Sequence, residues 1–269
     1  DSSSYSIEGE GLYNLALGGQ DVSDAYIKHA AVSGTGAGSG TIFDDCRIDP
    51  SASTGPAYFV RCGFNTPSGT PFASAAAGQY VFVDCVSLVA GSLTPYFDFS
   101  GEGSTVGVNF RRWSGGSYIT LDSDCTMTME VVTGGGQTIV TGGGNAEVRG
   151  ICRAVTLTLS ASETVQIAAV TGPIGISGAA TAATVNIYGV HGVVTNTSTG
   201  STVNTLGVSR ATVNLEVDDA LNTAIPGSPT ADSINQRVAA IDDLTQASGA
   251  GDLAAILTDT GTTLDDLGD

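Results

Sequence analysis

The stretch that decides the fold is residues 184–192, TVNIYGVHG, because similar stretches recur along the chain at a nearly fixed spacing. Residues 202–210 read TVNTLGVSR, and residues 164–172 read TVQIAAVTG. Further copies of this nine-residue window lie toward the N-terminus, at residues 145–153, 126–134, 107–115, 79–87, 56–64, 40–48 and 24–32. A period near 20 residues in a chain rich in Val, Thr and Gly is typical of a β-solenoid, in which each coil buries its apolar face by stacking on its neighbours.

Two positions of the window are apolar in nearly every copy, and we expect both to point into the core. Position four reads Ile27, Phe43, Phe59, Phe82, Phe110, Met129, Val148, Ile167, Ile187 and Thr205. Position seven reads Ala30, Cys46, Cys62, Cys85, Trp113, Val132, Ile151, Val170, Val190 and Val208. Side chains of a straight strand alternate between its two faces, so positions four and seven cannot both point inward unless the chain bends between them. We expect this corner at position six, which is Gly150, Gly189 and Gly207 in later copies.

In the early copies position six is charged instead of glycine. It reads His29, Asp45, Arg61, Asp84 and Arg112. Equivalent positions of a solenoid stack about 4.8 Å apart, so the last four residues are expected to form a ladder of alternating charge. One interpretation is a surface ladder that favours the correct register, at about 0–1 kcal/mol for each pair. The alternative is that these side chains line a groove for a ligand.

The pattern predicts an all-β protein, a parallel β-solenoid of about ten coils followed by a short α-helical segment. We assign residues 1–23 to an N-terminal cap or connector, residues 24–217 to the solenoid, and residues 218–269 to a linker and a helical stalk. A last strand is expected at residues 212–217. Ser228 and Pro229 then resemble the start of a helix, with an N-cap residue followed by proline at the first helical position.

The helical segment carries one narrow apolar stripe, made of Ile234, Val238, Ile241 and Leu244. A lone helix with so narrow a stripe buries too little surface to be stable. We therefore expect these four residues to be oligomer contacts in a short three-chain coiled coil, which makes the protein a homotrimer. The alternative is that the helix docks on the end of the solenoid as a cap.

The net charge of −18, with only nine Lys and Arg residues, argues against nucleic acid or an anionic membrane surface as a partner. Eleven of the acidic residues lie from Glu216 onward, where Arg237 is the one basic residue. No apolar run approaches the length of a membrane span, and no secretory signal pattern is present, so membrane insertion is not expected.

The five cysteines show no metal-binding pattern. The sequence has no C-x-x-C motif and no neighbouring pair of histidines, so we expect neither a metal site nor a cofactor. Cys46, Cys62 and Cys85 share the position-seven column and are expected to be reduced residues of the core. Reduced cysteines indicate assembly in a reducing cytoplasm.

The best catalytic candidates are Asp98 and Glu102, which lie beside Tyr96, Phe97 and Phe99 in the longest insertion between windows. Paired carboxylates hydrolyse polysaccharides. We favour the alternative that this insertion is an ordinary loop whose aromatic side chains pack on the solenoid, and we expect no enzymatic activity. Further carboxylates considered for the same chemistry are Asp44, Asp45, Asp84, Asp122 and Asp124. His29 and His191 have no nucleophile arranged around them, and His191 is expected at the surface.

Residues 220–267, which contain LNTAIPGSPTADSINQRVAAIDDLTQ and GDLAAILTDT, resemble segments of tail proteins from tailed bacteriophages. The resemblance implies a non-enzymatic structural component of the virion, a tail fibre or baseplate-associated protein. Its partners would be copies of itself and other tail proteins, and it would be assembled in the host cytoplasm and located in the virion tail. The alternative is a tailspike-type receptor-binding protein that binds or depolymerises a glycan of the host surface. A bacterial adhesin is disfavoured by the cysteines and by the absence of a signal pattern.

Overall fold

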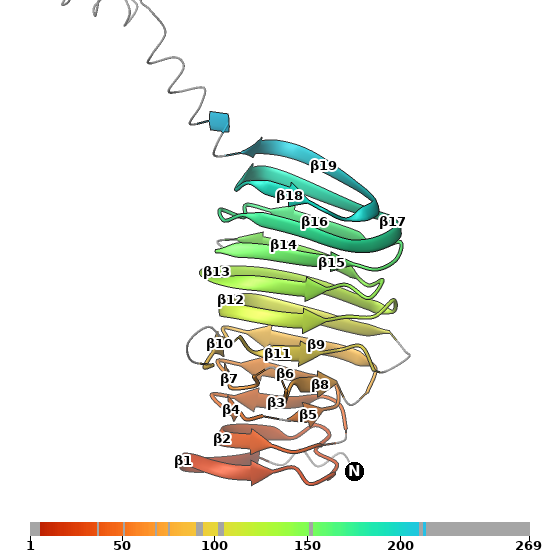
Figure 1. Ribbon diagram of the computed structural model, residues 1–269. Coiled ribbons are helices and arrows are strands. Elements are labelled where there is room, and N and C mark those ends of the chain that lie inside the picture. The colour runs from red at the N-terminus through yellow and green to blue at the C-terminus, as the bar shows by residue number, and fades with distance from the viewer. Residues whose placement is uncertain are drawn as a thin grey trace, which may run out of the picture. The chain divides into compact units, whose positions relative to one another are not determined.

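The computed structural model describes residues 6–213 apart from short gaps, and it confirms the parallel β-solenoid (Figure 1). The gaps are residues 37, 51, 68, 75, 90–93, 102–104, 151–152 and 210–211, and for residues 6–12 only the backbone is described. The strands are β1 (Ser6–Ala16), β2 (Tyr26–Ser33), β3 (Thr41–Asp44), β4 (Arg47–Ile48), β5 (Ser53–Thr54), β6 (Ala57–Val60), β7 (Gly63–Phe64), β8 (Phe72–Ser74), β9 (Gly78–Val83), β10 (Val86–Ser87), β11 (Tyr96–Asp98), β12 (Val106–Thr120), β13 (Cys125–Val140), β14 (Asn145–Gly150), β15 (Ala154–Leu159), β16 (Thr164–Ala168), β17 (Ile174–His191), β18 (Val194–Asn196) and β19 (Thr199–Ser209).

The strands stack as rungs from β1 to β19, and all pairings among the described strands are parallel (Figure 1). The nine-residue windows form one face of the solenoid, which runs through β2, β3, β6, β9, β12, β13, β14, β16, β17 and β19. A short second face joins β4, β7 and β10. A third face runs through β5, β8, β11, β12, β13, β15, β17 and β18. Each coil therefore encloses one central core.

The position-four column forms the centre of that core, as the sequence predicts. Phe43, Phe59, Phe82 and Phe110 lie on successive coils with stacked rings whose centroids are 5.0, 5.0 and 4.4 Å apart. The column continues with buried Met129, Val148, Ile167 and Ile187. Thr205 at its end is exposed, because β19 is the last described strand and among the described strands pairs only with β17. The core is thus aromatic in the early coils and aliphatic in the later ones.

The expected corner at position six is present with a left-handed backbone in eight of the ten copies, and it is absent at Val131 and at Gly207. The φ angles are +54° at His29, +51° at Asp45, +53° at Arg61, +55° at Asp84, +56° at Arg112 and +56° at Ala169. Gly150 and Gly189 have φ angles of +106° and +70° at the same position. A single left-handed residue reverses the alternation of side chains, so the position-seven residue can also turn inward. Ala30, Cys46, Cys62, Cys85, Trp113 and Val170 are accordingly buried.

Three of the expected inward residues at position seven point outward instead. Val132 is 44% exposed because β-branched Val131 occupies position six, where a left-handed backbone is unfavourable, and β13 continues without a corner. Val131 itself is buried. Val190 is 54% exposed although Gly189 is left-handed like the other corners, and the buried side chain after this corner is that of His191. Val208 pairs in register with Val190 and is 48% exposed. Ile151 lies outside the described residues.

The residue that turns inward after Gly189 is His191, which we expected at the surface. Its side chain is buried, at 2% exposure, and its Nδ1 lies 2.7 Å from the carbonyl oxygen of Gly192, so Nδ1 donates this hydrogen bond. Its Nε2 has no hydrogen-bond partner within the described structure. His191 is position eight of its window, one residue beyond the position that is buried in the earlier coils.

The N-terminal end adds a strand to the solenoid, whereas the C-terminal end differs from expectation. Strand β1 lies in the segment assigned to a cap or connector, and it pairs in parallel with β2 as a further strand of the same sheet. At the other end, Thr212 and Val213 are helical, whereas a strand was expected at residues 212–217. The Thr212 amide donates to Ser209 Oγ at 2.9 Å, which is the N-cap interaction that starts a helix. Residues 214–217 lie outside the described part of the chain.

Four cysteines, Cys46, Cys62, Cys85 and Cys125, are free and buried. Burial raises the pKa of the Cys125 thiol to about 12. These residues therefore act as small apolar residues of the core, as expected, while Cys152 lies outside the described residues.

A buried carboxylate fixes the turn between β15 and β16. Glu163 is 1% exposed, and its Oε1 accepts hydrogen bonds from Thr141 Oγ1 at 2.6 Å and the Ser160 amide at 2.7 Å. Its Oε2 accepts from the Ala161 amide at 2.7 Å. Burial by itself would raise the pKa of this carboxyl, but the hydrogen bonds together lower it below its ordinary value. The turn is therefore stabilised by the ionised form of Glu163.

We expect Phe59→Ala to lower the free energy of unfolding by about 3–5 kcal/mol, because it opens a cavity between two stacked rings. The matched control is Tyr58→Ala, since Tyr58 is the preceding residue of β6 and is 47% exposed on the opposite face. Tyr58→Ala should lower the free energy of unfolding by about 1 kcal/mol or less. Equal losses for the two variants in denaturant unfolding would contradict the strand register described above.

Glu163→Gln should lower the free energy of unfolding at pH 7 by about 1–3 kcal/mol, because it removes the charge that these hydrogen bonds stabilise. Since the folded state lowers the pKa of Glu163, its contribution is present above the unfolded pKa of about 4.3 and is lost as the pH falls below that value. The difference between wild type and variant should therefore shrink in denaturant unfolding at pH 3. Glu147→Gln, at an outward residue paired with Arg149, is the control and should change stability by less than about 1 kcal/mol. If Glu163→Gln lowers the free energy of unfolding by the same amount at pH 3 and at pH 7, this role of Glu163 is wrong.

Candidate functional site

The insertion that carries the polysaccharide-cleaving candidates is mainly a packing element. Phe97 and Phe99 are fully buried in the core. Tyr96 packs edge-on against Tyr118 with ring centroids 4.9 Å apart, and its hydroxyl is 3.1 Å from Thr120 Oγ1. The aromatic side chains thus pack on the solenoid, in agreement with the favoured interpretation of this loop.

Of the two acidic residues of the insertion, the structure describes Asp98 alone. Asp98 ends β11, and its Oδ1 accepts hydrogen bonds from the Ser100 amide at 3.1 Å and the Ser100 hydroxyl at 2.6 Å. These bonds are those of a tight turn that follows a strand. Glu102 lies outside the described residues, so the separation of the two carboxylates stays a prediction. The described geometry gives Asp98 a role in shaping its own loop.

The other carboxylates considered for catalysis are also held by the scaffold. Asp44 is buried, and it accepts from the Tyr26 hydroxyl at 2.6 Å and from the Arg61 guanidinium. Asp122 Oδ1 accepts from the Asp124 amide at 3.2 Å and lies 3.2 Å from Cys125 Sγ. The carboxylates of Asp44 and Asp122 therefore have structural partners in place.

The charged corner column forms separate pairs and not the continuous ladder that we expected. Arg112 binds Asp84 through two hydrogen bonds of 2.5 and 2.7 Å, and this contact lowers the pKa of Asp84 and raises that of Arg112. His29 Nε2 lies 3.2 Å from Asp45. The ion pair of Arg61 is with Asp44, one residue before the corner, because the guanidinium reaches this less exposed carboxylate.

These corners hold charged residues in a conformation that costs about 1–2 kcal/mol for a residue other than glycine. The column borders a groove of about 470 Å³. The groove is lined by His29, Asp45, Cys46, Arg47, Arg61, Gly63, Val86 and Leu88. Its charged side chains already have partners, since His29 lies against Asp45, while Arg47 pairs with Asp49 at 2.7 Å and Arg61 with Asp44 outside the groove lining. A ligand here would have to compete with these internal pairs.

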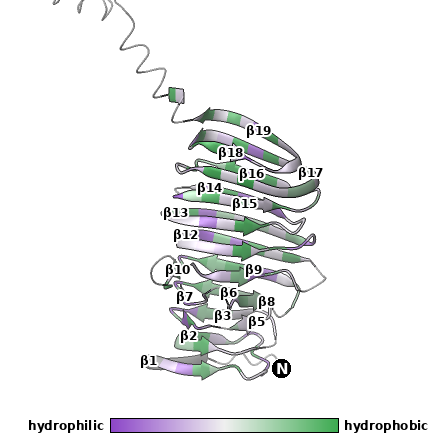
Figure 2. Cartoon of the chain, in the orientation of Figure 1, coloured by the Kyte–Doolittle hydropathy of each residue, from purple (hydrophilic) through white to green (hydrophobic). Residues whose placement is uncertain are grey.

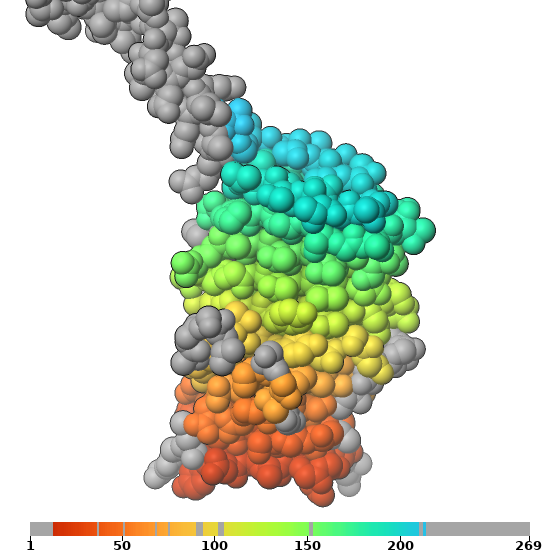
Figure 3. All heavy atoms as spheres, viewed as in Figure 1, coloured from red at the N-terminus to blue at the C-terminus, as the bar shows by residue number. Residues whose placement is uncertain are grey.

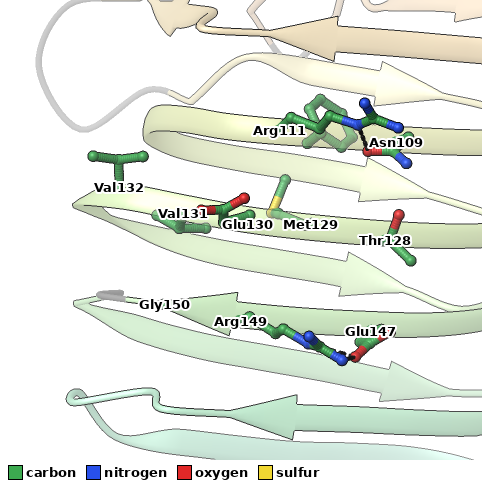
Figure 4. A pocket seen from close by; sticks show the side chains of 11 residues that line it. Asn109, Arg111, Thr128, Met129, Glu130, Val131, Val132, Glu147, Arg149 and Gly150 are labelled. Carbon is green, nitrogen blue, oxygen red and sulfur yellow. Dashed lines mark hydrogen bonds and ion pairs between the residues drawn. The ribbon is translucent and has the colours of Figure 1, made fainter.

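A larger groove, of about 770 Å³, lies on the outer face of β12, β13 and β14 (Figure 4). It is built from the outward positions three and five of three successive windows, and its polar side chains are Asn109, Arg111, Thr128, Glu130, Glu147 and Arg149. Register fixes their order, because Thr128 pairs with Glu147 and Glu130 pairs with Arg149 across neighbouring strands. Val131 and Val132 line the end of the groove at positions six and seven of the middle window.

The groove presents balanced charge and many hydrogen-bonding groups. Arg111 Nε donates to Asn109 Oδ1 at 3.3 Å, and Arg149 donates to Glu147 along its own strand, so the two arginines extend along the groove (Figure 4). Glu130 is exposed between the strands that carry them. This arrangement suits the binding of a polar, hydroxyl-rich molecule. In the part of the chain that the structure describes, no group of three or more His, Cys, Asp or Glu side chains is placed to hold a metal ion.

The residues of this groove are not among the candidate site residues expected from the sequence. The signal was available, because positions three and five of a window must face outward when positions two and four face inward. In the copies at residues 107–115, 126–134 and 145–153 these outward positions are polar or charged, whereas Ile42, Tyr58 and Val81 occupy position three in earlier copies.

No helix in the described ranges is long and apolar enough to cross a membrane. Comparisons with models of known protein families, with curated proteins and with solved structures found no match to this chain.

Proposed function

We propose that this chain is a non-enzymatic structural component of a bacteriophage virion, a tail fibre or baseplate-associated protein that assembles as a trimer. Its partners are copies of itself and other tail proteins, and it is assembled in the host cytoplasm. The observation that carries the proposal is the combination of a β-solenoid with residues 220–267, which resemble phage tail segments. A β-solenoid is compatible with tail fibres and tailspikes.

The solenoid has the physical properties that a fibre component requires. Its coils are joined by parallel backbone hydrogen bonds along the whole stack, and its core contains a continuous column of buried side chains. Such a core is close-packed and resists compression. The described cysteines are free, which agrees with assembly in a reducing compartment.

The trimer is proposed from the stripe Ile234, Val238, Ile241 and Leu244, which lies outside the described residues. The described solenoid adds an independent reason for association, because β19 pairs only with β17 there and has one open edge. An open strand edge invites uncontrolled pairing unless another element covers it. A bundle of helices from three chains would hold three such edges in a defined arrangement.

Gold-labelled antibodies against the purified chain should bind to the tails of the virions that contain it, as seen by electron microscopy. Pre-immune serum is the control and should leave the tails unlabelled. Labelling of the bacterial cell surface in the absence of virions would contradict the proposal and would favour an adhesin.

The second candidate function is a tailspike-type receptor-binding protein, which the polar groove over β12, β13 and β14 favours. Binding a host glycan requires hydrogen-bonding groups at fixed spacing, and the stacked strands supply them. Depolymerase activity would need a pair of carboxylates as well.

We expect the purified chain to release no reducing sugar from capsule or lipopolysaccharide of the host, because Asp98 is engaged by its own turn. A reducing-sugar assay measures this, with a known depolymerase as positive control. Activity that is lost in Asp98→Asn or Glu102→Gln would contradict the non-enzymatic proposal and establish the tailspike alternative. Asp44→Asn serves as the matched control, because Asp44 is buried beside Tyr26 and Arg61.

A further inference from the structure

The outer surface of the window face changes its character along the stack. Position five is charged in β12, β13 and β14, where it is Arg111, Glu130 and Arg149. It is Ala168 in β16. In β17 and β19 it becomes Tyr188 and Leu206, which are 38% and 60% exposed. Equivalent outward positions thus pass from charged to apolar toward the last coil.

Exposed apolar residues lie on neighbouring strands on both sides of position six in the last two copies, and we call them the terminal ridge. The ridge consists of Tyr188, Val190, Leu206 and Val208. Tyr188 pairs in register with Leu206, and Val190 pairs in register with Val208, so the four side chains lie two by two on neighbouring strands. Figure 2 shows hydrophobic segments on β19 at this end of the solenoid. Contiguous exposed apolar side chains of this kind mark interaction surfaces.

The terminal ridge is not needed to fill the core of the solenoid. Val185 and Ile187 are buried at this level of the stack, and Val203 packs against the core from β19. The ridge side chains face the opposite way, with Val190 and Val208 54% and 48% exposed. Folding of the single chain therefore gives no reason for these residues to be apolar.

The charge distribution indicates which partner fits the ridge. Residues 164–209 contain no Asp, Glu, Lys or Arg, although the whole chain has a net charge of −18. Copies of so acidic a chain repel one another wherever their charged surfaces approach. The uncharged coils are the part of the described solenoid where identical chains can approach with least repulsion. An acidic or basic partner would find no complementary charge there.

The position of the ridge in the chain favours the same partner. Val208 lies 26 residues before Ile234, the first residue of the apolar stripe, as the difference between 234 and 208 gives. If the stripes of three chains associate, the ridges of those chains are held at high effective concentration. Weak apolar contacts then suffice to bring the ridges together.

We propose that the terminal ridge is the contact between the solenoids of identical chains, in which each ridge packs against the ridges of its copies. This inference rests on the proposed trimer, and it identifies the solenoid surface that takes part in it. The ridge side chains are exposed on the outer side of the last coils, where the same residues of an identical chain can reach them. The charged strands β12 to β14 then stay in contact with water.

The first test compares Leu206→Asp/Val208→Asp with the control Thr126→Asp/Thr128→Asp, each in the full chain. Both variants add two negative charges at exposed residues of the window face. Sedimentation equilibrium should show that the ridge variant dissociates into monomers at a protein concentration at least tenfold higher than the wild-type chain does. For the control variant this concentration should change less than threefold. Thermal melting of each variant checks that the solenoid is folded.

The second test is Leu206→Cys with mild oxidation, which should give covalent dimers on a non-reducing gel, whereas Thr128→Cys should not. This readout does not depend on how the aspartate variants fold. The ridge contact would be wrong if the chain is a trimer but Leu206→Cys gives no crosslink and the aspartate variant dissociates at the same concentration as wild type. The proposed trimer itself would not be affected by that result. A wild-type monomer would overturn the trimer and the ridge together, while the gold labelling of virions decides separately on the phage assignment.

Discussion

The whole structure depends on the in-register stacking of parallel strands. Each coil donates and accepts backbone hydrogen bonds to the next, so a residue lies directly beside its equivalent at the strand spacing of about 4.8 Å. Every property of one window position is therefore repeated as a column along the solenoid. Phe43, Phe59, Phe82 and Phe110 form stacked rings for this reason, with centroid separations of 5.0, 5.0 and 4.4 Å. The same constraint decides what each column can contain on the outer surface.

The corner at position six is the second requirement, because it lets one strand segment and the next both face the core. A left-handed residue makes this turn, and glycine would adopt the conformation without strain. The early coils use charged residues at φ angles between +51° and +56° instead, and these residues form pairs such as Arg112 with Asp84. The pairs offset part of the strain at the surface. Where Val131 stands at this position the corner is absent, and the following side chain is exposed.

The outer columns carry whatever function the solenoid has, because the inner ones are occupied by packing. Polar positions three and five form the groove over β12, β13 and β14, and apolar positions form the terminal ridge on β17 and β19. The two surfaces lie on the same face of the stack but at different levels. A chain that presents a polar groove in one region and an uncharged apolar ridge in another can bind a ligand and copies of itself without competition between the two.

The sequence by itself determined the repeat, the solenoid, the position-four core and the corner, because each depends on one residue type recurring at a fixed spacing. It also indicated correctly that the aromatic residues of the insertion pack on the solenoid. Only the tertiary structure decided which residue turns inward after a corner, since Gly189 has the same left-handed backbone as the earlier corners but is followed by an exposed Val190 and a buried His191. It likewise decided that Arg61 binds Asp44, because an arginine side chain can reach several carboxylates that column spacing alone does not distinguish. The outward positions of the groove and of the terminal ridge could be read from the repeat, but only the structure showed that a groove forms over β12, β13 and β14 and which position-seven residues stay exposed.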